Sequence, residues 1–306
     1  MIETHSTTIL LRYGEIGLKT DYVRTSFEHR LIHNITTALT THGIPHTITN
    51  GRGRIYLTTP HPDQTIPILQ HISGLVSVSP TTTTTSDLTA LTQDTITYAT
   101  PLLSPTTSFA LRVTRTGTHP YTSQDAAIHI GAALQTHTHA PVNLTAPTQE
   151  IHIEIRNKNA YLYTQIIRGI GGLPVGTQGT VAVLLTHPTD LLAAWYMMHR
   201  GCQLLLITTN TALTALIHQF QTTWNLTSPT HHLDPTTPDY HDALHHLCLY
   251  HHCDALATPT TLADPQAIHH LTTLKTHIHL PLLTPLIALT HQEITAQCIH
   301  RHIPST

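Results

Sequence analysis

The spacing of apolar residues divides the first part of the chain into short strands and one long helix. Apolar residues that alternate or run continuously predict strands, whereas apolar residues three or four positions apart predict helices. The helix covers residues 21–41, where Phe27, Leu31 and Ile35 are spaced four apart. The predicted strands are residues 7–13, 44–49 and 53–58. This β–α–β–β order is compatible with a small ferredoxin-like sandwich.

A second α+β block follows a polar break at Pro80–Ser86. The threonine run Thr81–Thr85 inside that break predicts a polar linker. The elements predicted for the block are a helix near 88–98, a strand at Phe109–Arg115, a helix at Ser123–Leu134, and strands at Ile151–Arg156 and Ala160–Ile166. Residues 167–180 are rich in glycine and connect this block to a third one.

The third block begins with a strand–turn–helix unit at residues 181–201. Its first six residues, VAVLLT, are typical of a buried parallel strand, and residues 190–200 have the length of a helix that ends at Gly201. Further apolar runs predict strands at 204–207, 255–257 and 281–287. We therefore expect residues 175–306 to form a shortened parallel α/β sheet with its C-terminal edge uncovered.

The turn of this unit decides what it could bind. In a nucleotide site, glycines let backbone N–H groups approach the phosphates, and the helix N-terminus adds a partial positive charge. Here the turn reads Thr186-His187-Pro188-Thr189-Asp190. Pro188 has no N–H, and two Cβ atoms occupy the space that a phosphate would use. Thr186 and Asp190 keep functional roles open, although an aspartate at this position is also an ordinary helix cap.

Length and charge set further bounds. With 306 residues the chain exceeds the usual single-domain size, so two or three domains are expected. It has no run of about 18 apolar residues and no signal-peptide pattern, which predicts a soluble cytoplasmic protein without a membrane partner. The net charge is −3, but residues 1–168 hold eleven Lys and Arg against ten Asp and Glu, and residues 169–306 hold three against seven. RNA would therefore dock on the first half.

The 29 histidines do not predict a metal site. Codons for Thr, His, Pro and Gln all begin with A or C followed by A or C, so a base skew of the coding strand would enrich these residues together. The densest cluster, HHLCLYHHC at residues 245–253, offers ligands that suit zinc or copper, yet its spacing matches no closed tetrahedral motif. The four cysteines are irregularly spaced and suggest no disulfide framework.

Three motifs, in order along the chain, carry a family resemblance. They are Arg12-Tyr13-Gly14-Glu15-Ile16-Gly17-Leu18-Lys19 with Arg24, Phe27, Glu28, Leu31, Asn34 and Ile35; Phe109–Arg115 with His119, Thr122-Ser123 and Gly131; and the glycine-rich segment Gly169–Gly179. The first resembles the N-terminal signature of the tRNA 4-thiouridine sulfurtransferases. The second resembles that family's THUMP domain, and the third its linker into the catalytic domain. The match runs from about residue 8 to residue 303.

The resemblance implies three domains: an N-terminal ferredoxin-like domain (1–79), a THUMP RNA-binding domain (80–168), and a shortened Rossmann-like PP-loop α/β domain (169–306). In this family, ATP adenylates a uridine of tRNA, and a persulfide sulfur then replaces the activated oxygen; some members also supply sulfur to thiamine synthesis. The implied cofactors are ATP and Mg. The implied partners are tRNA, a sulfur-donor or catalytic partner protein, and a second copy in a homodimer.

The resemblance also selects candidate site residues. THUMP binding should depend on phosphate contacts and on the shape of an A-form or single-stranded end. The candidates for RNA binding are Lys19, Arg24, Arg112, Arg115 and His119, each of which could also be an exposed solubilising group. The candidates for nucleotide binding are Leu184, Leu185, Thr186, Thr208, Thr209, Thr258 and Pro259. Asp190 is the candidate catalytic residue.

Departures from the family pattern concentrate in the third domain. The family's Ser-Gly-Gly-X-Asp-Ser loop stands here as residues 186–191 and keeps only the aspartate. Its Thr-Gly-Glu-Ser segment stands as residues 258–261 (TPTT), and two later cationic side chains are replaced by Thr284 and His291. The sequence given ends before the segment where many members place the persulfide cysteine, and Cys248-X4-Cys253 does not match the Cys-X-X-Cys pair of archaeal-type members.

Three functions are compatible with these observations. The first is a tRNA-binding relative that acts in tRNA thiolation and has lost ATP-dependent adenylation. The second is an active tRNA sulfurtransferase whose site is unorthodox or completed by a partner. The third is a metal-sequestering or sulfur-carrier protein that uses the His/Cys cluster. Nucleotide binding separates the first two.

Overall fold

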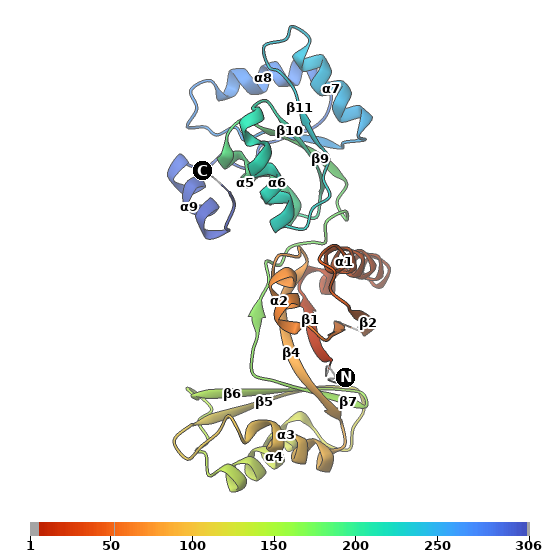
Figure 1. The fold of residues 1–306 in the computed structure, drawn as a ribbon, viewed down its shortest axis with the longest axis vertical. Coiled ribbons are helices and arrows are strands. Elements are labelled where there is room, and N and C mark those ends of the chain that lie inside the picture. Colours follow the sequence, from red (N-terminus) through yellow and green to blue (C-terminus); the bar gives the residue numbers. More distant parts are fainter. Residues whose placement is uncertain (1–5, 52, 305–306) are drawn as a thin grey trace. The chain divides into compact units, whose positions relative to one another are not determined.

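The computed structural model describes residues 6–51 and 53–304, which form two compact units. One unit comprises Met1–Arg12, Gly43–Ile66 and Ser77–Arg168, and the other comprises Tyr13–His42, Pro67–Val76 and Gly169–Thr306. Each contains one main β-sheet (Figure 1). Among the described helices, none is both long enough and apolar enough to cross a lipid bilayer.

The sheet of the first unit has eight strands in the order β2-β3-β1-β4-β7-β6-β5, with β8 also paired to β4. Neighbouring strands are antiparallel in the described pairings except β5 and β6, which run parallel. The strands are β1 (Thr7–Tyr13), β2 (Thr47–Gly51), β3 (Arg54–Thr59), β4 (Leu75–Thr85), β5 (Phe109–Thr116), β6 (Gln149–Arg156), β7 (Asn159–Tyr163) and β8 (Ile167–Arg168).

The element order at the N-terminus is that of a ferredoxin-like domain, as predicted. It runs β1, η1 (Glu15–Leu18), α1 (Asp21–Thr41), β2, β3, α2 (Pro62–Gln70) and β4. The bounds of α1 agree with the predicted helix because its apolar spacing is regular: Leu31 and Ile35 are fully buried, and Phe27 is half-buried.

The predicted linker at Thr81–Thr85 is wrong, because these residues form the end of β4. Residues Thr82 to Thr85 pair with Leu162 to Asn159 of β7, and the Thr81 hydroxyl donates to the carbonyl of Thr8 at 2.8 Å. Threonine is β-branched and suits an extended backbone, so a threonine run is compatible with a strand even though it is polar.

The remainder of the first unit is a THUMP-type α+β layer. Helices α3 (Leu88–Ala99) and α4 (Ser123–Thr138) cover one face of β5, β6 and β7 (Figure 1). Ile151, Ile153 and Ile155 of β6 belong to the core beneath these helices. Since side chains alternate along a strand, Glu154 and Arg156 lie on the opposite, helix-free face. The predicted strand at Ala160–Ile166 is shorter than expected and ends at Tyr163.

The second unit contains the predicted parallel Rossmann-like sheet, with strand order β11-β10-β9-β12-β13. Its strands are β9 (Thr180–Leu185), β10 (Gln203–Thr208), β11 (Thr230–His232), β12 (Ala255–Ala257) and β13 (Leu282–Leu283). Its helical segments are η2 (Pro188–Asp190), α5 (Leu191–His199), η3 (Thr211–Leu213), α6 (Thr214–Thr223), α7 (Tyr240–Tyr250), α8 (Ala267–His277) and α9 (His291–His300).

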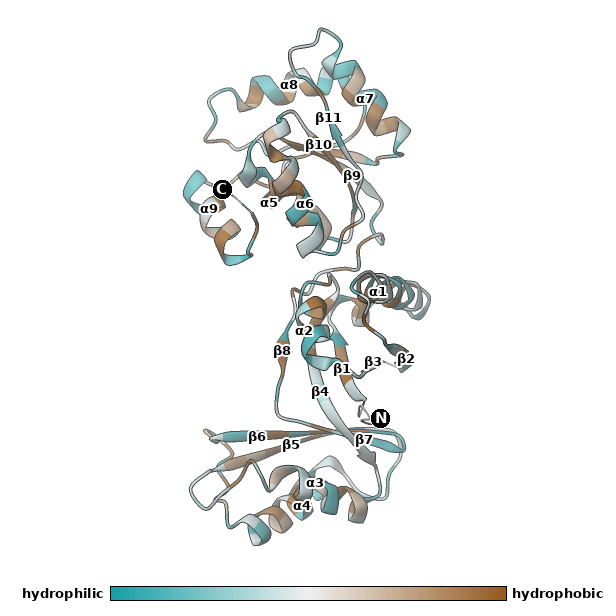
Figure 2. Ribbon diagram, viewed as in Figure 1, coloured by the Kyte–Doolittle hydropathy of each residue, from teal (hydrophilic) through white to brown (hydrophobic). Residues whose placement is uncertain are grey.

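Two apolar cores sandwich this sheet. Val181, Val183 and Leu185 of β9 pack with α5, α6 and α9, whereas Ala182 and Leu184 pack with α7 and α8 on the other face. Figure 2 accordingly shows α5 as largely hydrophobic, and α7 and α8 as mixed. The predicted strand at 281–287 shrinks to two residues because the chain turns directly afterwards, where the N–H of Ile287 donates to the carbonyl of Thr284.

Gly201 ends α5 as predicted. Its φ is +90°, a left-handed backbone conformation that residues other than glycine rarely adopt, and its N–H donates to the carbonyl of Met198 at 2.8 Å. A Cβ at this position would lie 2.6 Å from the Thr177 hydroxyl. The glycine is therefore needed both for the backbone turn and for the close approach of residues 173–177.

Candidate nucleic-acid and nucleotide sites

A surface hollow lies where three loops of the THUMP-type layer meet. The loops are β4–α3, β5–α4 and the β6–β7 hairpin, and the lining residues are Ser86, Asp87, Leu88, Thr118, His119, Pro120, Tyr121, Asn157 and Lys158. Gly117 allows two of these loops to approach, because a Cβ there would lie 2.7 Å from the side-chain oxygen of Asn157. Its φ of +103° also favours glycine.

Arg115 and His119, two of the predicted RNA-binding residues, come together at the rim of this hollow. His119 donates from Nε2 to the carbonyl of Asn157 at 2.6 Å, so its Nδ1 accepts from Arg115 at 3.1 Å. Arg115 also donates to the carbonyl of Gly117 at 2.9 Å. These bonds fix the imidazole between the two loops.

Tyr121 and the start of α4 support the same rim. The Tyr121 ring lies 5.5 Å from that of His119, and its hydroxyl donates to the carbonyl of Ser86. Burial raises the pKa of Tyr121, although the charge of Arg115 opposes this. Thr122 and Asp125 cap α4 reciprocally, and the hydrogen bonds from Thr122 lower the pKa of Asp125.

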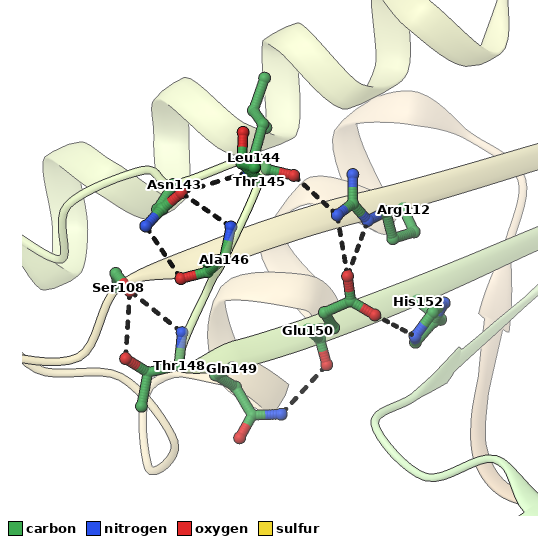
Figure 3. Close-up of polar contacts among 10 residues, drawn as sticks. All are labelled: Ser108, Arg112, Asn143, Leu144, Thr145, Ala146, Thr148, Gln149, Glu150 and His152. Atoms are coloured by element: carbon green, nitrogen blue, oxygen red, sulfur yellow. Dashed lines mark hydrogen bonds and ion pairs between the residues drawn. The ribbon is translucent and has the colours of Figure 1, made fainter.

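Arg112 has partners of its own at the other end of β5 (Figure 3). Its guanidinium donates to Glu150 at 2.8 and 3.0 Å and to the carbonyl of Leu144 at 2.8 Å. Asn143 closes the same loop through bonds with Thr145 and Ala146. Arg112 therefore holds the loop before β6, and its charge is matched by one carboxylate.

Lys19 and Arg24, the remaining two predicted RNA-binding residues, belong to the other compact unit, where Lys19 directly follows η1 and Arg24 lies near the start of α1. Arg24 forms an ion pair with Asp21 and donates to the carbonyl of Lys19 at 3.4 Å. The side chain of Lys19 is exposed. The structure thus brings Arg115 and His119 into contact at one site, gives Arg112 partners of its own, and assigns Lys19 and Arg24 to the other compact unit.

The predicted nucleotide-binding residues gather at the carboxyl edge of the parallel sheet. Strand β9 pairs with β10 on one side and with β12 on the other. The strand order reverses at β9, and ligands of open α/β sheets bind in the crevice at such a point. Leu184 and Leu185 end β9 and Thr186 follows it, Thr208 ends β10 and Thr209 follows it, and Thr258 and Pro259 follow β12.

The turn after β9 is closed by its own aspartate. The carboxylate oxygen Oδ2 of Asp190 accepts the N–H of Thr186 at 2.8 Å, the hydroxyl of Thr186 at 2.7 Å and the N–H of His187 at 2.8 Å. Asp190 is 7% exposed. Because a carboxylate is an anion with acceptor oxygens, it occupies the position that a phosphate would take on these donors. Its predicted catalytic role stays a prediction.

The neighbouring strand ends also form hydrogen bonds, within their own turns and to adjacent strands. Thr208 donates from its hydroxyl to the carbonyl of Asn210 at 3.0 Å, and the N–H of Thr209 donates to Leu185 at 3.1 Å. The N–H of Thr258 donates to Leu283 at 2.8 Å, and its hydroxyl lies 2.9 Å from that of Thr260. Nucleotide binding would have to compete with these bonds.

Cys298 of α9 lies against the same turn, a position that sequence spacing did not indicate. Its Sγ donates to the carbonyl of Thr189 at 3.9 Å, and burial raises the pKa of the thiol. A buried thiol with a raised pKa is a weak nucleophile. Within the described part of the chain, no three or more His, Cys, Asp or Glu side chains converge in a way that could hold a metal ion.

Comparison with known proteins assigns the first half of the chain. Residues 8–79 match the ThiI ferredoxin-like domain, and residues 85–165 match the THUMP domain. The chain is a relative of the tRNA sulfurtransferases. It is 36% identical over 206 residues to a probable tRNA sulfurtransferase of Methanosarcina acetivorans, covering 65% of this chain and 50% of that protein. The protein of the same description from Methanothermobacter thermautotrophicus is 38% identical over 206 residues, with 65% and 51% covered.

The chain spans about half the length of these curated relatives. Two solved structures share its fold. PH1313 from Pyrococcus horikoshii Ot3 has a TM-score of 0.82 at 24% identity, covering 97% of this chain and 99% of that one. A 4-thiouridine synthetase–RNA complex with bound ATP has a TM-score of 0.78 at 18% identity, covering 96% and 84%.

Proposed function

We propose that this relative of the tRNA sulfurtransferases binds tRNA and acts in tRNA thiolation without adenylating uridine itself. The observation that supports tRNA binding is the hollow of the THUMP domain, with Arg115 and His119 fixed at its rim and Lys158 exposed beside it. The half-buried imidazole of His119 suits contact with an unpaired base, and the exposed Lys158 suits a backbone phosphate.

The turn after β9 supports the loss of adenylation. The backbone N–H groups of Thr186 and His187 already donate to the carboxylate of Asp190, and Pro188 has no N–H to add as a third donor. A triphosphate would have to displace charge-assisted hydrogen bonds worth on the order of 1.5–3 kcal/mol each, and it would meet a negative charge at close range. We therefore expect ATP to bind more weakly than about 1 mM.

Two measurements on the full chain test this function. Filter binding with tRNA at low and moderate salt should show binding that weakens steeply as salt rises, since phosphate contacts release counterions. Calorimetric titration with ATP, with and without tRNA, should show no binding below about 1 mM. Absence of tRNA binding at low salt would remove the RNA function.

The second candidate is an active tRNA sulfurtransferase that uses ATP and Mg, with its site completed by a sulfur-donor or catalytic partner protein. Supporting it, Thr186, Thr208 and Thr258 lie at the carboxyl ends of three adjacent parallel strands, where the strand order reverses. Micromolar ATP affinity together with formation of 4-thiouridine in a reaction supplied with a sulfur donor would favour this candidate over the first.

A further inference from the structure

Three arginines converge on one buried carboxylate on the helix-free face of the first unit's sheet. The carboxylate belongs to Glu154, which is 3% exposed. Its oxygens lie 2.6 Å from Nε of Arg156, 2.8 Å from Nε of Arg54 and 3.4 Å from a terminal nitrogen of Arg12. We refer to Arg12, Arg54, Arg156 and Glu154 as the arginine cluster.

The cluster has more positive than negative charge. Among the residues that the structure describes, Glu154 is the acid that forms an ion pair with Arg12 and with Arg54. Two guanidinium ions on one carboxylate already leave one positive charge unmatched, whatever further interactions Arg156 makes. The other contacts of these two arginines are neutral: Arg12 donates to Ser79 and lies over the ring of Tyr163, and Arg54 donates to the carbonyl of Gly53.

The unmatched charge is both confined and reachable. The Arg12 side chain is 14% exposed and that of Arg54 is 26% exposed, so each keeps part of its surface open to solvent. A guanidinium has five N–H donors in a planar fork, and the contacts above use only some of them. Partly buried positive charge attracts an anion, and the fork matches the geometry of a phosphate.

The position of the cluster indicates which phosphate. Arg156 ends β6, and the next two residues, Asn157 and Lys158, line the hollow of the THUMP domain. A nucleic-acid strand that leaves the hollow over the β6–β7 hairpin therefore meets the arginine cluster next. Resting on the proposed function, we propose that Arg12 and Arg54 bind a backbone phosphate of the tRNA whose end occupies the hollow.

Arg112 shows why this cluster differs from other arginines on the same sheet. It is paired with one carboxylate, Glu150, and its remaining bond goes to a backbone carbonyl (Figure 3). That arrangement is electrically balanced and serves the loop before β6. The arginine cluster carries an excess of positive charge and adjoins the hollow, so binding of an external anion would neutralise part of that charge.

The test compares tRNA binding by the full chain and by Arg54→Gln over a series of salt concentrations. Loss of one phosphate contact should weaken binding by about threefold to thirtyfold at low salt and reduce the slope of log K against log salt by about 0.7–0.9. Arg54→Lys keeps the charge without the fork, so we expect it to restore the slope and to recover the affinity only in part. Lys275→Gln, which removes an exposed charge on α8, is the matched control and should leave both quantities unchanged.

A second variant keeps the test decisive if Arg54→Gln does not fold. Glu154→Gln removes the negative charge and should bind tRNA more tightly with a steeper slope. An unchanged slope in whichever of these variants is folded by circular dichroism overturns the proposal while the wild type still binds tRNA. Failure of the wild type to bind tRNA at low salt overturns the proposed function and this inference together. If Arg54→Gln loses affinity for inorganic phosphate but keeps the tRNA slope, the site binds a free anion and the proposal is wrong.

Discussion

The carboxylate of Asp190 satisfies the donors that a nucleotide-binding turn would offer to a phosphate. Two backbone N–H groups and one hydroxyl converge on a single oxygen atom of this buried side chain. Asp190 therefore stabilises the turn, whether or not it also has a catalytic role. Stability and activity measurements on the same variant separate these roles.

We expect Asp190→Ala to lower the free energy of unfolding by about 2–3 kcal/mol, because it removes the charged acceptor of two partly buried backbone N–H groups and one hydroxyl. Asp190→Asn should cost less, since the amide oxygen can still accept. Urea unfolding followed by circular dichroism measures both. Asp239→Ala is the control, because Asp239 precedes α7 without a side-chain cap bond. Equal stability of Asp190→Ala and the wild type would contradict the structural role.

The double change His187→Gly with Pro188→Gly should strengthen ATP binding about tenfold. Two positions regain room at the start of the helical segment and one regains an N–H donor, and a charged hydrogen bond is worth on the order of 1.5–3 kcal/mol. Calorimetric titration compares the variant with the wild type. If the wild type already binds ATP at micromolar concentrations, the side chain of His187 must replace the missing donors, and the proposed loss of adenylation fails.

At the scale of elements, histidines line the contact between α7 and α8. The rings of His241 and His277 stack with centroids 4.7 Å apart, and the ring of Tyr240 lies 5.1 Å from that of His241. Asp242 lies 3.8 Å from His277. Burial, followed by the charge of His277, lowers the pKa of His241 below its usual 6.5, against the opposing effect of Asp242. Protonation therefore disfavours this contact.

Stability should consequently fall as the pH drops below about 6.5. A group whose pKa is lower in the folded state binds fewer protons when folded, so protonation of the unfolded chain favours unfolding in the window below its unfolded value. Urea unfolding at pH 7.5 and pH 5.5 should show a smaller loss for His241→Gln than for the wild type. His218→Gln, at an exposed position of α6, should lose as much as the wild type. The same loss in both variants would rule out His241 as a source.

Elements with clean apolar spacing could be predicted from the sequence, and those interrupted by histidine or threonine could not. The bounds of β1, α1 and β12 agree with prediction. Helix α7 was missed although Leu244 and Cys248 are buried four residues apart, because histidines separate them. Motifs led to Arg115 and His119 because the two are only four residues apart, at the end of β5 and in the loop that follows it. The arginine cluster joins residues from β1, β3 and β6, and only sheet pairing brings these together.

At the scale of the whole molecule, the glycine-rich segment 169–179 is bonded along its length. Gly171 accepts from the N–H of Gly74 at 2.7 Å, the carbonyl of Leu173 accepts from Ser73 at 2.7 Å, and the carbonyl of Val175 accepts from Asn34 at 3.0 Å. These partners belong to the same compact unit as the segment. The segment is therefore part of the folded structure that includes α1.

This arrangement sharpens a prediction for the isolated N-terminal half. Residues 1–168 should fold and bind tRNA at low salt, since the THUMP domain and most basic residues lie there. A longer piece, residues 1–179, keeps the three bonds above and should unfold several degrees higher, as each is worth about 0.5–1.5 kcal/mol. Thermal unfolding and filter binding of both pieces test this. Identical melting temperatures would contradict the stabilising role of the segment.

The carbonyl of Gly201 gives the C-terminal sheet domain a structural role that does not depend on catalysis. It accepts the N–H groups of Gly176, Thr177 and Gln178, and the carbonyl of His199 accepts that of Leu173. Without this domain, these N–H groups would lose their acceptors. The segment 169–179, which bonds Asn34 and Ser73, would then lose its support. Substitutions in the turn at residues 186–190 would leave the hydrogen bonds to Gly201 and His199 in place. Selection can therefore relax at the turn after β9 and still preserve the strand and helix on either side of it.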